Sequence, residues 1–279
     1  MFNTIPIAPK DQIFSLIQQY NNDKNPDKIN LLSGVYRDAD GNVPILKSVH
    51  RAEMELLQEE KSKDYLDIEG DKNYRECIPA LLGLKNRHFD AIQTPGGTSA
   101  LRLVAEFIHQ FSPTSTVWIS NPTWINHHNI FKAAEVAIQE YPYYDATKKE
   151  IPFDQLLASL KKAKAGDFLL LHTCCHNPTG CDFSKEQWKT VLELVTQLSL
   201  IPIFDNAYQG FAEELSEDAY PIQLFAENSH KLRLQCHHNT RCTSHFLIRA
   251  NLQRHRIYEI LHHKLCPNLL QHLPETLHL

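Results

Sequence analysis

Residues 167–180 read DFLLLHTCCHNPTG, an uninterrupted apolar run followed at once by a polar loop that is rich in turn residues. An apolar run of this length without alternation is typical of a strand that is buried on both faces of a sheet. The pair Asn177 and Pro178 favours a turn, and Gly180 can adopt a positive φ before the next helix. The stretch therefore predicts a buried parallel strand with a loop at its carboxyl end.

Similar apolar runs recur along the chain, and amphipathic helical patterns separate them. We expect strands at 89–93, 116–120, 135–140, 167–172 and 200–204. We expect helices at 98–110, 124–134, 153–164 and 184–198. Strands that alternate with helices of this length predict an α/β fold whose mostly parallel sheet has helices on both faces. Nearer the N-terminus, Asp11 can cap one further helix, and another is expected to follow Pro44.

The overall composition is that of a globular protein and excludes several other classes. The 279 residues are 42% hydrophobic and 22% charged, which suffices for a sizeable core. A net charge of −5 supplies no basic field for nucleic acid, and no apolar run is long enough to span a membrane. Seven cysteines and no signal-peptide pattern favour the reducing cytoplasm. We expect a cytoplasmic enzyme that binds neither nucleic acid nor membrane.

The C-terminal residues 231–279 differ in composition from the rest of the chain. They hold seven of the 28 Lys and Arg but two of the 33 acids, a charge of +5 that leaves −10 for the remainder. They also hold eight of the 16 His and none of the 9 Gly. Turn-forming residues are therefore scarce. We expect this tail to pack poorly, with helical patches from its leucines and few long-range contacts.

Ligands of parallel sheets bind in the loops at the carboxyl ends of the strands. The first two such loops are 94–99 and 121–127. Gly96 and Gly97 permit close backbone approach at a helix start, which favours a phosphate, although most Gly-Gly turns bind nothing. Trp124 could present its flat face to an aromatic ligand, or it could be a packing residue at a helix start.

The other two loops are 173–180 and 205–210. Asp205 ends an apolar strand, where a carboxylate could hold a proton on a ring nitrogen or could cap a helix. Two histidines and two cysteines between His172 and His176 also raise a zinc alternative. Adjacent Cys174 and Cys175 point apart and lack the usual two-residue spacer, so we predict no metal site here.

Three motifs in this order carry a family resemblance: NPTW followed by NH at 121–127, HNPTG at 176–180, and DNAYQGF at 205–211. They resemble the aspartate and aromatic amino acid aminotransferases, which are class I aminotransferases and pyridoxal-phosphate enzymes of fold type I. The stretches LLSGVYRDADG, PILKSV and DYLDIEGDKNYRE also look like this family. The resemblance runs from about residue 4 to about residue 230.

The resemblance implies a fold type I aminotransferase large domain that is truncated, together with part of the small domain from the N-terminus. Residues 1–45 would form an N-terminal arm and small-domain segment. Residues 46–230 would form an incomplete pyridoxal-phosphate-binding large domain. Residues 231–279 would be a tail that is not homologous to the family.

The resemblance also implies how the chain would hold the cofactor. Gly97 and Thr98 would contact its phosphate, and Trp124 would stack on its pyridine ring. Asp205 would pair with the protonated ring nitrogen, with His127 behind it. Each role agrees with the chemistry that the loops offer, because amides bind phosphate and a carboxylate stabilises a pyridinium.

Further roles concern the cofactor's phenolic oxygen, the substrate and a second subunit. Asn177 and Tyr208 would hydrogen-bond the phenolic oxygen of the ring. Gly34 would touch the substrate carboxylate, with Trp124 and Asn177 also lining the substrate site. Tyr65 would reach the phosphate of the neighbouring subunit, because the family forms homodimers with shared active sites.

One element of the family pattern is missing. A Ser-x-x-Lys motif should follow the Asp205 loop, and its lysine forms the Schiff base and moves the proton at the substrate α-carbon. The expected window, 231–245, reads KLRLQCHHNTRCTSH and lacks the motif. Lys231 comes too early and Lys264 has an unrelated context. We hypothesise that the reading frame changes near Leu232, which sequencing of the coding region would test.

The function implied is transfer of an amino group between aspartate, or an aromatic amino acid, and a 2-oxo acid. Without the lysine we predict no catalytic residue, pyridoxal phosphate held noncovalently at best, and an impaired or inactive chain. The alternative is a non-catalytic truncated product or a pyridoxal-phosphate-binding pseudoenzyme. A variant of it gives the tail a metal site, although the spacings match no zinc pattern. Its ligands would be Cys236, His237, His238, Cys242, His262, His263 and Cys266.

Overall fold

The structure is a computed structural model that describes residues 12–29, 38, 42–62, 64–84, 90–228, 233–239 and 242–249. The chain divides into two compact units, Met1–Tyr65 and Leu66–Leu279. The first unit contains helices α1 (Gln12–Asn22) and α2 (Lys47–Glu59), as expected after Asp11 and Pro44. The cap proposed for Asp11 lies outside the described residues. The domain boundaries expected at residues 45 and 230 stay predictions.

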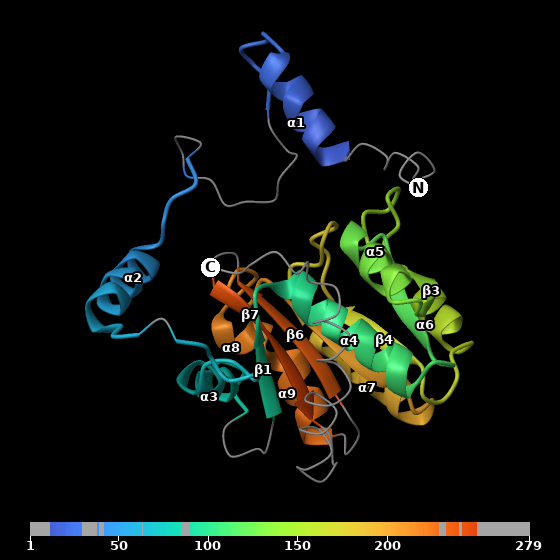
Figure 1. The fold of residues 1–279 in the computed structure, drawn as a ribbon. Coiled ribbons are helices and arrows are strands. Elements are labelled where there is room, and N and C mark those ends of the chain that lie inside the picture. The colour runs from blue at the N-terminus through green and yellow to red at the C-terminus, as the bar shows by residue number, and fades with distance from the viewer. Residues whose placement is uncertain are drawn as a thin grey trace, which may run out of the picture. The chain divides into compact units, whose positions relative to one another are not determined.

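The second unit is built around one seven-stranded sheet (Figure 1). In chain order its strands are β1 (Asp90–Thr94), β2 (Thr116–Asn121), β3 (Ala137–Pro142), β4 (Phe168–His172), β5 (Ile201–Asn206), β6 (Arg233–Asn239) and β7 (Cys242–Arg249). Across the sheet they follow the order β1-β7-β6-β5-β4-β2-β3. The pairs from β6 to β3 are parallel, and β7 is antiparallel to both of its neighbours. The mostly parallel sheet predicted from the sequence is confirmed.

Helices cover both faces of this sheet, which is why every residue of β4 is buried. The helices are α3 (Lys72–Leu81), α4 (Gly97–Phe111), α5 (Ile125–Ala133), α6 (Phe153–Leu160), α7 (Lys185–Gln197), α8 (Leu215–Asp218) and α9 (Tyr220–Asn228). Phe168 and Leu170 of β4 pack with α4 and α5, whereas Leu169 and Leu171 pack with α6, α7 and α9. Figure 1 shows α4 and α7 on opposite sides of the sheet. Among the described helices, none is long and apolar enough to cross a membrane.

The prediction that the tail packs poorly as helical patches is wrong for two of its segments. Strand β6 pairs in parallel with β5, and β7 joins β6 to β1. Without them, the backbone N–H and C=O groups of β5 and β1 would face an open gap in the middle of the sheet. This demand for backbone partners comes from the rest of the fold, so the tail's composition does not reveal it. The remaining tail residues lie outside the described part of the chain.

Two features that hold the second unit together were not predicted. Helix α3 begins after Asp71, whose carboxylate accepts a hydrogen bond from the Tyr74 amide at 2.7 Å and so forms an N-cap. Asp167 is 5% exposed and lies just before β4. Its carboxylate accepts bonds from the Thr116 amide at 3.0 Å, the Lys164 amide at 2.9 Å and the Trp118 indole at 3.1 Å. Asp167 thereby ties the amino ends of β2 and β4 together.

Candidate functional site

The four loops chosen from the sequence follow β1, β2, β4 and β5, and three of them are in direct contact. Thr123 of the second loop bonds His172 at the end of β4, and His127 bonds Asp205 at the end of β5. The hydroxyl of Thr173 donates a short hydrogen bond to Asn206. The first loop lies at the same edge of the sheet, because β1 runs in the same direction as β5. Three strand spacings, about 14 Å, separate these two strands.

A continuous chain of hydrogen bonds links the three contacting loops. The Asn177 amide donates to His172 Nδ1 at 3.3 Å, and His172 Nε2 lies 3.2 Å from the Thr123 hydroxyl. That hydroxyl is 2.7 Å from His127 Nδ1. His127 Nε2 is in turn 3.0 Å from Asp205 Oδ2. His127 and Asp205 are 0% and 5% exposed, so this end of the chain of bonds is shielded from water.

The direction of these hydrogen bonds follows from their first donor. A backbone N–H can only donate, so His172 Nδ1 accepts and the proton of the neutral His172 ring lies on Nε2. That proton is donated to the Thr123 oxygen, and the Thr123 hydroxyl proton is donated to His127 Nδ1. His127 must then carry its proton on Nε2, where it is donated to Asp205. The geometry therefore fixes both tautomers and makes Asp205 Oδ2 the acceptor at the end of the chain of hydrogen bonds.

Aromatic and polar side chains surround this pair. Trp124 makes an edge contact with the His127 ring, with 5.4 Å between the centroids. Tyr208 accepts a hydrogen bond from the side chain of Asn177. Burial, followed by the charge of Asp205, raises the pKa of Tyr208, and the bond from Asn177 only partly offsets this. Tyr208 therefore keeps its phenolic proton at neutral pH.

The start of helix α4 offers backbone donors. The residue at its N-cap position is Gly96, which has no side chain to cap the first-turn amides. A Cβ atom built on Gly96 would meet no atom within 4 Å, so the space beside this backbone is open. An anion can occupy such a helix start, because both the amides and the helix dipole favour negative charge.

His176 lies next to the chain of hydrogen bonds and is held neutral. Its Nε2 is 3.0 Å from the Ser120 hydroxyl and its Nδ1 is 2.9 Å from the Thr179 hydroxyl. Its ring stacks on Tyr143 with 3.7 Å between the centroids. Burial, followed by the nearby His172 and His127, lowers the pKa of His176 to about 2.

His176 should make the stability of the protein fall as the pH is lowered. Its ordinary pKa is 6.5, so below that pH the unfolded chain takes up a proton that the folded chain refuses. The free energy of unfolding should fall by up to about 1.4 kcal/mol per pH unit from this group alone. Urea unfolding should be measured at several pH values between 7 and 5. The free energy of unfolding should fall less steeply with decreasing pH in His176→Gln than in the unchanged chain. The exposed His109→Gln is the control, and equal slopes in all three proteins would contradict the prediction.

A metal ion is the other occupant that the side chains suggest. Among the described residues, the group with suitable ligand spacing consists of His127, His172 and Asp205, whose ligand atoms lie within 4.8 Å of one another. Cys174 and Cys175 do not belong to it. A metal would have to displace Thr123 or Asp205 from His127, since both ring nitrogens of His127 are already hydrogen-bonded. The hydrogen bonds account for this cluster without a metal.

The remaining predicted site residues are less closely placed. Gly34 and the proposed metal ligands of the tail lie outside the residues whose side chains are described. Tyr65 is fully exposed at the end of the first unit. Thr123 and the role of His172 were not predicted from the sequence, although both residues flank predicted site residues. Their signal would have been the four-residue spacing from Thr123 to His127 and the position of His172 at the end of its strand.

Comparison with known proteins identifies the family. The family model for aminotransferase class I and II matches residues 26–237. The chain belongs to this family. The match extends to residue 237 and so past residue 230, the expected end of the resemblance.

Among the curated relatives of this aminotransferase-family chain, the aspartate aminotransferases of Salmonella typhi and Escherichia coli K12 are 45% and 44% identical over 232 residues. The aromatic-amino-acid aminotransferase of Pseudomonas aeruginosa is 42% identical over 231 residues. These alignments cover 81% of this chain but 58–59% of the relatives, so the chain spans less than two thirds of their length.

Solved structures confirm the fold type I aminotransferase architecture. An aromatic-amino-acid aminotransferase from Burkholderia pseudomallei, covalently bound to pyridoxal phosphate, has a TM-score of 0.88 and is 33% identical. The alignment covers 94% of this chain and 68% of that one. An aromatic amino acid aminotransferase from Psychrobacter sp. B6, cocrystallised with aspartic acid, also has a TM-score of 0.88 and is 34% identical.

Proposed function

We propose that this chain has an incomplete aminotransferase fold that binds pyridoxal phosphate noncovalently. We further propose that the reaction of this fold is the transfer of an amino group between aspartate and a 2-oxo acid. Aromatic amino acids are the second candidates for the amino-group donor. The names of the curated relatives support both substrate classes. The structure of the Burkholderia pseudomallei relative supports the cofactor.

The buried pair His127 and Asp205 is the observation that carries this proposal. When bound, pyridoxal phosphate supplies a protonated ring that accepts the electron pair left at the substrate α-carbon. The Asp205 carboxylate is shielded from water, so it can hold a proton on a ring nitrogen. His127 donates to Asp205 and keeps the carboxylate oriented. The residues present therefore fit the cofactor.

The other loops supply matching groups. Gly97 and Thr98 would bind the phosphate at the start of α4, where the space beside Gly96 is open. Trp124 would cover one face of the ring, and Asn177 and Tyr208 would hydrogen-bond its phenolic oxygen. Trp124 and Asn177 would also line the substrate site, and Gly34 remains a proposed contact of the substrate carboxylate.

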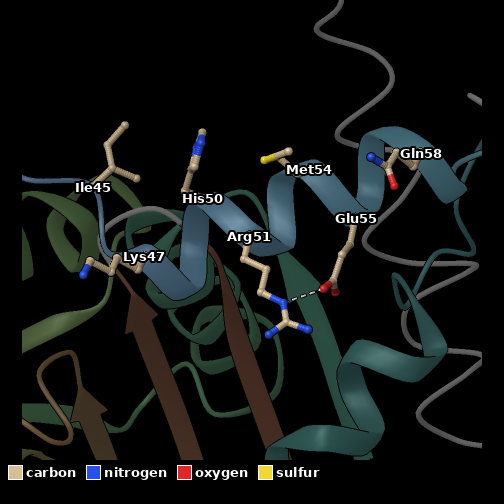
Figure 2. Close-up of a pocket in the computed structure, with 7 residues that line it drawn as sticks. All are labelled: Ile45, Lys47, His50, Arg51, Met54, Glu55 and Gln58. Atoms are coloured by element: carbon tan, nitrogen blue, oxygen red, sulfur yellow. Dashed lines mark hydrogen bonds and ion pairs between the residues drawn. The ribbon is translucent and has the colours of Figure 1, made fainter.

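We also propose a homodimer, and helix α2 supports it. Among the described residues of α2, none is buried, and Met54, Leu56 and Leu57 are 51%, 64% and 84% exposed. Together with Ile45, residues of α2 line a pocket, and Figure 2 shows their side chains with the ion pair between Arg51 and Glu55. Large apolar side chains that are exposed together on one helix typically mark a surface that packs against a partner.

Sedimentation velocity tests the homodimer directly. Because Leu57 is the most exposed apolar residue of α2, Leu57→Glu should shift a dimer toward monomer, whereas the polar exposed exchange Gln58→Glu should not. A chain that sediments as a monomer at all micromolar concentrations would contradict the proposal. The role of Tyr65 at a neighbouring subunit's phosphate depends on this dimer.

A non-catalytic role is the second candidate, and the sequence of residues 231–245 favours it. This window contains no Ser-x-x-Lys motif, so the lysine that attaches the cofactor in this family has no counterpart there. The chain would then be a truncated product or a pseudoenzyme that retains cofactor binding. A cytoplasmic location is also proposed, because all four cysteines whose side chains are described are free thiols.

Equilibrium binding of pyridoxal phosphate tests the proposed function. We expect saturable, 1:1 binding that quenches tryptophan fluorescence through Trp124, and Trp124→Phe should lose most of the quenching. Pyridoxal, which lacks the phosphate, should bind at least about tenfold more weakly because the start of α4 is left empty. Equal binding of the two compounds, or the absence of saturation, would overturn the proposal.

A further inference from the structure

Asp182 holds the loop that carries Asn177. Its two carboxylate oxygens accept hydrogen bonds from the Cys175 amide at 2.6 Å and the His176 amide at 2.9 Å. Cys175 has a φ of 47°, a left-handed conformation that a non-glycine residue adopts only when its surroundings impose it. Asp182 thus fixes the backbone of the two residues that immediately precede Asn177.

Asp218 holds the loop that carries Tyr208 in the same way. Its side chain is 4% exposed and accepts bonds from the amides of Gly210 at 2.7 Å, Ala212 at 3.1 Å and Glu213 at 3.1 Å. The backbone of Tyr208 is linked to the same loop, because its carbonyl oxygen accepts a hydrogen bond from the Phe211 amide at 3.1 Å. One buried carboxylate therefore organises the residues that follow Tyr208.

The two carboxylates act on opposite sides of one contact. Asn177 and Tyr208 hydrogen-bond each other through their side chains, across the gap between the loops that follow β4 and β5. Asn177 and Tyr208 lie beyond the last residues that pair β4 with β5, His172 and Asp205, so side-chain acceptors such as Asp182 and Asp218 hold the backbone there. The two loops also lie close enough for charge to act between them, since the charge of Asp218 adds to burial in raising the pKa of Cys174.

We propose that Asp182 and Asp218 are positioning residues that hold Asn177 and Tyr208 in the geometry that pyridoxal phosphate requires. The inference rests on the proposed function and assigns to that site two residues that do not touch it. A carboxylate suits this task because it accepts several N–H bonds at once, and bonds to a charged acceptor are stronger than neutral ones.

Asp167 provides a matched control for Asp218. It is buried to the same degree, 5% against 4% exposed, and its carboxylate also accepts three N–H bonds. It lies at the amino end of β4, however, whereas the site lies at the carboxyl end. The five residues of β4 separate the two ends by about 13 Å. Asp167→Ala should therefore cost stability without disturbing the site.

Amide hydrogen exchange tests, without any cofactor, whether the carboxylates of Asp182 and Asp218 hold the two loops. In Asp218→Ala, the amides of Gly210, Ala212 and Glu213 should exchange at least about tenfold faster, while Thr116 should not change. In Asp182→Ala, the accelerated amides should be those of Cys175 and His176. Asp218→Asn keeps the shape and part of the acceptor, so it should show a smaller effect if the alanine variant is too unstable to study. Unchanged exchange of these amides would overturn the proposal.

A double-mutant cycle then tests whether Asp218 acts through the Asn177–Tyr208 contact. Asp218→Ala should weaken pyridoxal phosphate binding about tenfold to a hundredfold, as loss of an orienting partner does at other sites. In a Tyr208→Phe background the same change should cost much less, because the contact it supports is already lost. Asp167→Ala should leave the dissociation constant unchanged in both backgrounds.

The possible outcomes separate this proposal from the proposed function. Equal losses in the two backgrounds, or an equal loss from Asp167→Ala, would show a general effect on folding and overturn the positioning role. If the unchanged chain does not bind pyridoxal phosphate at all, the proposed function fails. In that case the exchange rates alone still decide whether the two carboxylates hold the loops.

Discussion

Purified chain that is supplied with aspartate, 2-oxoglutarate and pyridoxal phosphate should transaminate no faster than the cofactor alone. The reaction needs a base that moves the proton at the substrate α-carbon, and residues 231–245 contain no lysine in the required motif. General acid–base catalysis is worth about 10²–10⁴-fold, and correct orientation of the substrate can supply roughly 7–11 kcal/mol more. These losses fall on one step, so they need not add, but either alone makes the chain effectively inactive.

The assay needs a positive control and a variant that identifies the source of any turnover. The aspartate aminotransferase of Escherichia coli, which is 44% identical over 232 residues, shows that the conditions support the reaction. Turnover by the chain that clearly exceeds the cofactor background, and that disappears in Asp205→Ala, would contradict the prediction. Some other residue would then have taken over the role of the lysine.

The layered fold was predictable because its signal is local. Strands β2, β4 and β5 of the parallel part are short apolar runs, and β4 alternates its residues between two helix layers as a doubly covered strand must. The helix starts were predictable to within a few residues for the same reason. Helix α9 was not predicted; it begins at Tyr220, two residues after the end of α8 at Asp218, so no separate loop marks its start in the sequence.

Long-range pairing was not predictable from the same signals. Strands β6 and β7 lie in the compositionally unusual tail, where the lack of glycine suggested poor packing. Their position depends on the open edges of β5 and β1, and those edges exist only once the rest of the sheet is formed. The hypothesis of a changed reading frame is a statement about the coding region, and the pairing of these strands does not test it.

The site was predictable where a motif fixed both partners. The sequence analysis expected His127 behind Asp205, and the structure places them 3.0 Å apart. It did not find the link through Thr123 and His172, because that link depends on which way two side chains point from separate loops. The role of Asp218 was not predicted for a similar reason. Its carboxylate accepts hydrogen bonds from backbone amides, and no residue pattern predicts the path of the loop that carries them.

Replacing Asp205 should have the largest effect of any single change in the site. Asp205→Ala removes the carboxylate that would face the pyridine nitrogen and leaves the His127 N–H without its acceptor. Loss of one partner from a buried charged pair, here the carboxylate and the protonated ring nitrogen, costs about 3–5 kcal/mol. Pyridoxal phosphate binding should therefore weaken at least about a hundredfold. Titration of the variant, with circular dichroism to confirm that it is folded, measures the effect. The exposed Asp154→Ala, in helix α6, should bind as the unchanged chain does.

A cofactor analogue that has carbon in place of the ring nitrogen separates the two contributions of Asp205. This analogue cannot be protonated at that position, so it gains nothing from a carboxylate there. If Asp205 acts on the ring nitrogen, the unchanged chain should prefer pyridoxal phosphate over the analogue, and Asp205→Ala should abolish that preference. Asp205→Asn should abolish it too, although its side-chain oxygen can still accept the bond from His127. If instead Asp205→Ala weakens both compounds equally, Asp205 acts by holding His127 and the loop in place, and the pyridinium role assigned to it is wrong.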